Sequence, residues 1–247
     1  MDSKNIESEA LLYTISSRDT FYREELKYLD LSDFQYDKEK TPKLFSHYKK
    51  SVFYRTKKHS KKVYRIFQWK VPVVIYFDKE IPNKIKKEVK SFYSQVNDID
   101  NLSVTFTNNI DKANYRVQIT DEIFSTNSKT YKLSEKFTVN NYFFDYCNYF
   151  LINDNRNGII GCSLKINREQ LNNNDHLLAN IKQGIFLSLG RFFLNASLMD
   201  ESILTNLIYE NEKIISDLDL SILKLHYYQL YNRRIDGTDF ETLLQKN

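Results

Sequence analysis

Residues 174–190 constrain the fold of this chain more than any other segment. The segment starts with Asn174 and Asp175, which are both suited to cap a helix, and it ends at Gly190, a residue type common at helix stops. Apolar residues recur on more than one side of the intervening helix: Leu177, Leu178, Ile181, Ile185, Leu187 and Leu189. We therefore predict a mostly buried central helix, which other elements of the same domain must cover.

The chain before this helix has the pattern of a mixed β-sheet. The β-branched run Val71–Phe77 predicts a buried strand, and Pro82–Phe92, with proline at its start and apolar residues four and three apart, predicts an amphipathic helix. Further strands are expected at 102–107, 115–120, 138–151 and 158–166. This order predicts an α+β fold in which one helix backs a mixed sheet of about five strands.

A closing helix is predicted near the C-terminus. Ser216 is placed as its N-cap, and apolar residues share one face of the helix at Leu218, Ile222, Leu225 and Tyr228. Asp217 and Asp219 are of a type found at solvated helix starts, where carboxylates favour the positive end of the helix dipole. We therefore expect these two carboxylates to be exposed.

Composition restricts the function only broadly. Residues 1–40 predict an N-terminal helical arm, and 41–247 the main domain. No run of about 18 apolar residues occurs, so we expect no transmembrane segment. Met1–Asn5 lacks the apolar core of a signal peptide, which leaves two alternatives: a cytoplasmic protein, or one that starts after a removed signal or lipid-anchor segment. The net charge of +4 is too small to favour nucleic acid, and the oligomeric state stays open.

One local segment is strongly basic. Residues 49–70 contain seven Lys and two Arg, interleaved with aromatic residues. Four lysines near the centre are candidate anion-binding residues: Lys57, Lys58, Lys61 and Lys62. The alternative is the solvated tip of a helix or hairpin whose aromatic residues are buried, which is the usual role of such charge runs.

The cysteines and histidines do not form a recognised catalytic pattern. Cys147 and Cys162 lie on two expected strands, where both a cross-strand disulfide and two free buried thiols stay open. His176 falls at the start of the central helix, where we expect a surface or capping role. His226 falls on the closing helix, where we expect a structural role.

Four short segments occur in an order and spacing shared with a known family. They are Trp69–Val73, the helix end around Gly190, the tripeptide Ser202–Leu204 and the helix after Ser216. Over about residues 41–240 the chain thereby resembles the metzincin-type zinc metalloproteases and their poorly characterised bacterial relatives. The resemblance implies two histidines and a glutamate on the central helix, a third ligand beyond its glycine, and a Ser-x-Met turn beneath the metal.

The residues at those positions cannot perform that chemistry. Three ligand positions hold Gln183, Leu187 and Phe193, the position of the general base holds Gly184, and the methionine position holds Leu204. Zinc in proteins is bound by imidazole, thiolate or carboxylate groups, and its water needs a base. We therefore expect a degenerate, inactive relative that has no metal and no cofactor.

This expectation leads to a binding function. The leading hypothesis is a non-catalytic module that binds a protein or peptide through the former substrate cleft. In the family an exposed strand pairs with an extended peptide, and here we assign that role to 158–166, with candidate partner-binding residues Gly158, Ile160, Cys162, Leu164 and Ile166. The alternatives are an anionic-surface binder that uses 49–70 for nucleic acid, lipid head groups or glycans, and a hydrolase whose residues follow no recognised motif.

Overall fold

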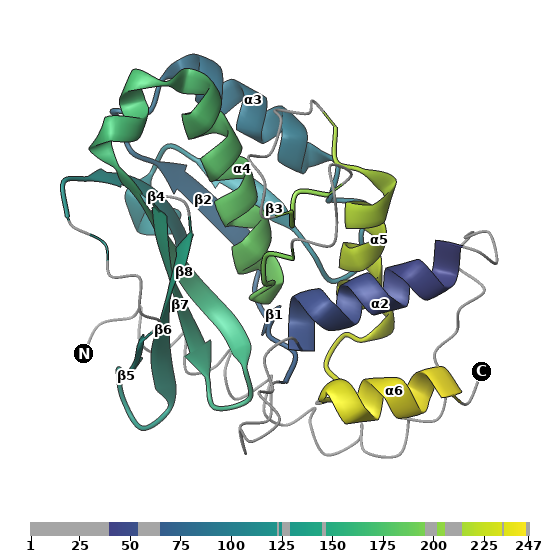
Figure 1. Ribbon diagram of the computed structural model, residues 1–247. Coiled ribbons are helices and arrows are strands. Elements are labelled where there is room, and N and C mark those ends of the chain that lie inside the picture. Colours follow the sequence, from purple (N-terminus) through teal and green to yellow (C-terminus); the bar gives the residue numbers. More distant parts are fainter. Residues whose placement is uncertain are drawn as a thin grey trace.

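A mixed β-sheet with two helices packed on one face forms the larger part of the structure (Figure 1). The structure is a computed structural model that describes residues 40–53, 65–122, 124, 129–144, 147–195, 202–205, 214–233 and 235–245. Over these residues the fold contains a sheet of eight strands and five α-helices. The candidate anion-binding lysines at 57–62 and nearly all of the expected N-terminal arm lie outside the described residues.

The sheet combines a parallel half with an antiparallel half. Its strands lie in the order β3 (Val104–Thr107), β2 (Val73–Phe77), β4 (Tyr115–Thr120), β8 (Gly158–Asn167), β7 (Cys147–Asp154), β6 (Phe137–Phe144) and β5 (Lys129–Lys132). Pairing is parallel from β3 to β8 and antiparallel from β8 to β5. The short β1 (Gln68–Trp69) also pairs with β8, in parallel. The mixed sheet predicted from the sequence is therefore present.

The number of strands differs from the prediction of about five. The single strand expected at 138–151 is two strands, β6 and β7, which pair in antiparallel register. Their aromatic residues run through both strands, so the pattern does not show where one ends and the next begins. Strands β1 and β5 are too short to give a periodic signal in the sequence.

The prediction that 158–166 is an exposed strand is wrong. β7 pairs with one side of β8. On the other side, β1 pairs with the start of β8 and β4 pairs with its second half. Between these two, the Cys162 amide donates to the Asn114 carbonyl at 2.9 Å. Of the five candidate partner-binding residues on this strand, only Ile160 is more than slightly exposed. Since its backbone groups are used within the sheet, β8 offers no edge to a peptide.

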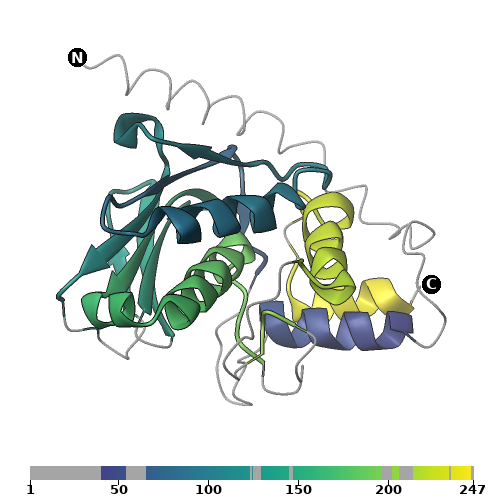
Figure 2. The ribbon, with the colours of Figure 1, turned by 90° about the horizontal axis from the view of Figure 1, so that it is seen from above.

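Helices α3 (Asn83–Ser94) and α4 (Asn174–Gly190) lie side by side on one face of the sheet (Figure 2). The predicted face of α3, with Ile85, Val89 and Phe92, is buried. Helix α4 is buried from residue 177 to residue 190, which confirms the central helix. Asn173 caps it, one residue before the predicted caps. No helix within the described residues is long and apolar enough to cross a membrane.

A second group of helices packs beside the sheet. Figure 2 shows α2 (Lys40–Phe53) next to α6 (Gly237–Gln245), and α5 (Asp217–Lys224) also packs against α2. Ser216 caps α5 as predicted, because its hydroxyl accepts the amide of Asp219. A π-helical turn, Leu225–Gln229, follows α5 directly. Because a π-turn holds one more residue than an α-turn, the residues that follow are rotated about the helix axis. Tyr227 is therefore buried and Tyr228 is 46% exposed, whereas the sequence predicted that Tyr228 lies on the apolar face.

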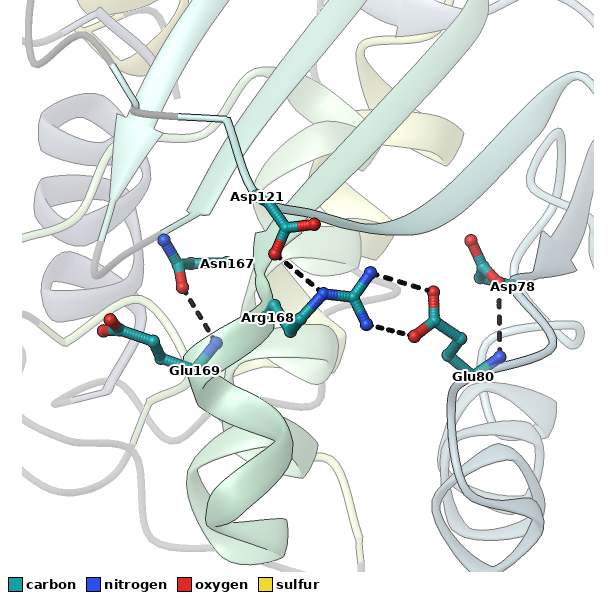
Figure 3. Close-up of polar contacts among 6 residues, drawn as sticks. All are labelled: Asp78, Glu80, Asp121, Asn167, Arg168 and Glu169. Carbon is teal, nitrogen blue, oxygen red and sulfur yellow. Dashed lines mark hydrogen bonds and ion pairs between the residues drawn. The ribbon is translucent and has the colours of Figure 1, made fainter.

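An arginine ties together the carboxyl ends of the parallel strands (Figure 3). Arg168, which follows β8, donates through Nε to Asp121 at 2.7 Å, just after β4. Its two terminal nitrogens reach Glu80, in the loop after β2. All three side chains are well exposed, so solvent and salt screen these ion pairs. We assign them a role in connecting loops, since exposed pairs of this kind contribute little to stability.

Candidate functional site

The first predicted ligand position, Gln183, is used to hold a turn. Its side-chain amide donates to the carbonyl of Ile203 at 2.9 Å and to that of Thr205 at 3.1 Å. Gln183 is 5% exposed, and Ile203 and Leu204 are fully buried. The side-chain amide is therefore paired with two backbone oxygens, as buried polar groups require. The structure thus brings Gln183 to the turn that contains Leu204.

A buried carboxylate holds the same turn from the opposite side. Asp219 of α5 accepts hydrogen bonds from the Ser202 hydroxyl, the Ile203 amide at 2.9 Å and the Ser216 hydroxyl at 2.8 Å. Burial raises the pKa of Asp219 to about 6, and the three donors oppose that rise. The prediction of a solvated carboxylate holds for Asp217, which is exposed, but is wrong for Asp219. The sequence places Asp219 in the first turn of the helix, but it does not show that the 202–205 turn covers it.

The predicted position of the general base, Gly184, faces the sheet. A Cβ atom at this glycine would lie 2.8 Å from Cζ of Phe144 on β6 and 2.9 Å from the methyl groups of Leu164 on β8. These separations are far below normal contact distances, so any larger residue here would require Phe144 and Leu164 to shift. A glutamate at 184 would have to displace these side chains or the helix itself.

The remaining positions lie at the end of α4. Leu187 is 2% exposed, and its carbonyl accepts the amides of Arg191 and Phe192, which closes the helix. The left-handed residue at this end is Arg191, with φ of 50°, and not the predicted stop Gly190. A Cβ at Gly190 would overlap the Phe192 ring, so the glycine permits close packing.

The third predicted ligand position, Phe193, contacts a different element, helix α2. Its amide donates to the carbonyl of Ser51 in α2 at 2.7 Å. The guanidinium of Arg191 lies 5.5 Å from the Phe193 ring and 3.8 Å from the Phe67 ring. The five positions that the resemblance predicted for the zinc site therefore have different structural roles, and no described contact joins all five.

A buried histidine, His226, connects three parts of the fold. Its Nδ1 lies 2.9 Å from the Tyr48 hydroxyl, and its Nε2 lies 2.8 Å from the Phe67 carbonyl oxygen. Because a carbonyl only accepts, Nε2 carries the proton and Nδ1 accepts from Tyr48. Burial lowers the pKa of His226 to about 3, so the ring is neutral. The predicted structural role of His226 is confirmed, and His176 lies exposed at the start of α4 as expected.

Side chains from other elements satisfy the carbonyls that the π-turn leaves free. Gln68 of β1 donates to the carbonyls of His226 and Leu230, and Asn101 donates to that of Tyr227 at 3.0 Å. These partners are far apart in the sequence, and no local pattern indicates them. The turn thereby joins β1 and the loop after α3 to the closing helix.

The two cysteines do not form the disulfide that the sequence left open as an alternative. Cys147 and Cys162 are both free and buried. In the β7–β8 register Cys147 pairs with Ile166, and Cys162 pairs with Leu151. Four residues along the ladder therefore separate the thiols, roughly 13 Å at the usual rise per residue, which is too far for a disulfide.

The comparisons with known proteins do not assign this chain to a family. Neither a scan against protein-family models nor a search of curated proteins found a match. Within the described residues, no group of three or more His, Cys, Asp and Glu side chains could hold a metal ion. The function must therefore be argued from the geometry of the described residues.

Proposed function

We propose that this protein is a non-catalytic binding domain with a degenerate metzincin-like fold, and that its ligand is a protein or peptide. The proposal rests on the observation that two positions of the former zinc site have structural roles. The side-chain amide of Gln183 donates hydrogen bonds to the 202–205 turn, and Gly184 allows α4 to approach the sheet closely. A catalytic centre needs these two positions free to face a metal and its water.

Energetic reasons support the same proposal. A metal site in the folded protein contributes binding free energy to folding, so its loss must be offset by other contacts. Here Leu187 and Leu204 are buried apolar side chains, and Gln183 and Asp219 hold the turn by hydrogen bonds from both sides. These interactions keep the segment ordered without an ion. A domain of this kind retains a scaffold that can present a binding surface after its chemistry is gone.

The catalytic half of the proposal can be tested with the purified full chain. We expect metal analysis by mass spectrometry to show no stoichiometric zinc, and we expect no cleavage of unstructured protein substrates. Stoichiometric zinc together with chelator-sensitive cleavage would overturn the proposal. Cleavage that chelators do not affect would instead favour a hydrolase of another class.

The binding half needs a measurement that separates the ligand classes. We expect the chain to bind an immobilised library of extended peptides more tightly than it binds RNA or anionic lipid vesicles. Binding to RNA or vesicles that collapses when salt rises above about 0.15 M would favour an anionic-surface function instead. The charge-reversed variant of Lys57, Lys58, Lys61 and Lys62 provides the matched control, because it should leave peptide binding unchanged.

A further inference from the structure

Among the described residues, strand β5 is the more open of the two ends of the sheet. The other end, β3, is partly closed, because the Val104 amide donates to the Asn97 side chain at 2.8 Å. Along β5 and the tip that follows it, residues 130–136 are all exposed, with Tyr131 at 50% and Leu133 at 63%. An edge strand whose polar backbone groups lack partners is a template for another strand.

The backbone of β5 directs specific groups to this edge. The Leu133 amide donates to the Phe137 carbonyl at 3.0 Å, so the odd-numbered residues of β5 face β6. Amide and carbonyl groups point to alternate sides along a strand, and those of Thr130 and Lys132 therefore point away from β6. These two residues supply the donors and acceptors that an added strand would use.

Side-chain hydrogen bonds fix the register of β5 on the sheet. The Thr130 hydroxyl donates to Asn140 of β6 at 2.9 Å, and Asn140 donates to Asn153 of β7 at 2.6 Å. At the hairpin tip, the Ser134 hydroxyl accepts the amides of Lys136 and Phe137. The edge is thus held in place before any ligand arrives, which reduces the entropy cost of binding.

The side chains at the edge select the chemistry of the partner. Lys132 and Thr130 lie on one face of the sheet, and Tyr131 lies on the other. An added antiparallel strand must set outward-pointing residues opposite one another, so a second copy of β5 centred on Lys132 would set this lysine opposite itself, and like charges in opposed positions are destabilising. An acidic residue opposite Lys132 and an apolar residue opposite Tyr131 are the favourable complement.

We propose that β5 binds an extended acidic segment of a partner protein, which adds to the sheet as a further strand with alternating acidic and apolar residues. This inference rests on the proposed binding function and assigns it a surface. Backbone bonds to Thr130 and Lys132 supply the affinity, and the charge of Lys132 with the ring of Tyr131 selects the sequence. The strand predicted from the sequence to bind a peptide, β8, does not compete with β5, because β8 is paired on both sides within the sheet.

The test uses the full chain and fluorescently labelled synthetic peptides. One peptide alternates glutamate with valine, and a matched peptide has lysine in place of each glutamate. We expect fluorescence polarisation to show binding of the acidic peptide and at least about tenfold weaker binding of the basic one. Hydrogen exchange should slow at the Thr130 and Lys132 amides when the acidic peptide is bound.

Three variants separate the backbone from the charge. Lys132→Pro removes an amide that points outward and leaves the bonds to β6 intact, so the chain should keep its melting temperature and lose peptide binding about tenfold or more. Lys132→Glu should reverse the preference and favour the basic peptide. Lys136→Glu makes the same charge change at the hairpin tip, outside the paired strand, and should bind as the wild type does.

Each contrary result has a distinct meaning. The inference is wrong if the acidic peptide does not bind, if both peptides bind equally, or if Lys132→Pro binds as the wild type does. It is also wrong if the chain associates with itself and Lys132→Pro abolishes that association. In these cases the proposed binding function still stands if another peptide binds elsewhere. Zinc-dependent cleavage of the peptide would instead overturn the proposed function itself.

Discussion

The side-chain amide of Gln183 lies 2.9 Å from the carbonyl oxygen of Ile203, and this contact joins the central helix to the turn that lies against it. Glutamine suits the position because it offers two donors, and the second reaches Thr205 at 3.1 Å. Glutamate offers no donor when it is ionised, and a neutral histidine offers only one. Gln183 is therefore suited to the structural task of holding this turn.

Replacing this glutamine should destabilise the fold. Gln183→Ala removes two buried hydrogen bonds, so we expect the free energy of unfolding to fall by about 2 kcal/mol or more. Gln183→Glu should cost more, because a carboxylate would face two carbonyl oxygens. Urea denaturation measures both effects, and His176→Ala, an exposed change on the same helix, is the control. Equal stability of Gln183→Ala and His176→Ala would refute this role.

The close approach at Gly184 gives a second prediction. Alanine has the better helix propensity by about 1 kcal/mol, so an open site would gain stability from Gly184→Ala. Here the added methyl group would meet Phe144 and Leu164 at less than 3 Å. We expect a net loss of roughly 1–2 kcal/mol by overpacking, measured by thermal or urea unfolding.

A double variant checks the cause of that loss. In a background of Leu164→Ala, which removes two of the three close contacts and leaves the one with Phe144, Gly184→Ala should cost less than it does in the wild type. If the cost of Gly184→Ala is the same in both backgrounds, contact with Leu164 is not its source.

Local patterns predicted the elements whose signals lie within one stretch of chain. The proline start and the buried face of α3, the strand β4 and the Ser216 cap all follow from neighbouring residues. The burial of α4 follows from apolar residues on all of its sides. In each case the responsible residues lie within about one helix or strand of one another.

The rest depends on which elements become neighbours. Nothing in 158–166 shows that β1, β4 and β7 would cover both of its sides. Asp219 carries no sign that it would be buried, because its donors come from a turn in a different segment. The resemblance placed Leu204 in a turn near the central helix, but it did not show that Gln183 would bind that turn.

The two thiols should be inert in the folded protein. Both cysteines are buried, and burial raises the pKa of Cys162 to about 12, so almost no thiolate forms at neutral pH. We expect a chromogenic disulfide reagent to react with neither residue in the native state. After unfolding without a reductant both thiols should react, and a reaction of neither would show that they are bonded.

The neutral, buried His226 makes stability depend on pH. The pKa of His226 in the folded protein is about 3, whereas a free histidine has a pKa of 6.5. Below pH 6.5 the unfolded chain takes up a proton that the folded chain does not, so the free energy of unfolding falls as pH falls from 6.5 toward 3. Asp219 acts in the opposite direction, because its raised pKa of about 6 gives stability that grows as pH falls from 6 toward 3.8.

A comparison of two proteins isolates the histidine. His226→Gln keeps one acceptor for Tyr48 and one donor for the Phe67 carbonyl but cannot titrate, and both proteins retain Asp219. At pH 7 we expect the wild type to be the more stable protein. Between pH 7 and pH 4 its advantage should shrink by a few kcal/mol, on the order of 3, because only the wild type must keep a histidine neutral. Urea denaturation at several pH values measures this difference. Parallel pH profiles for the two proteins would show that His226 does not control the acid response.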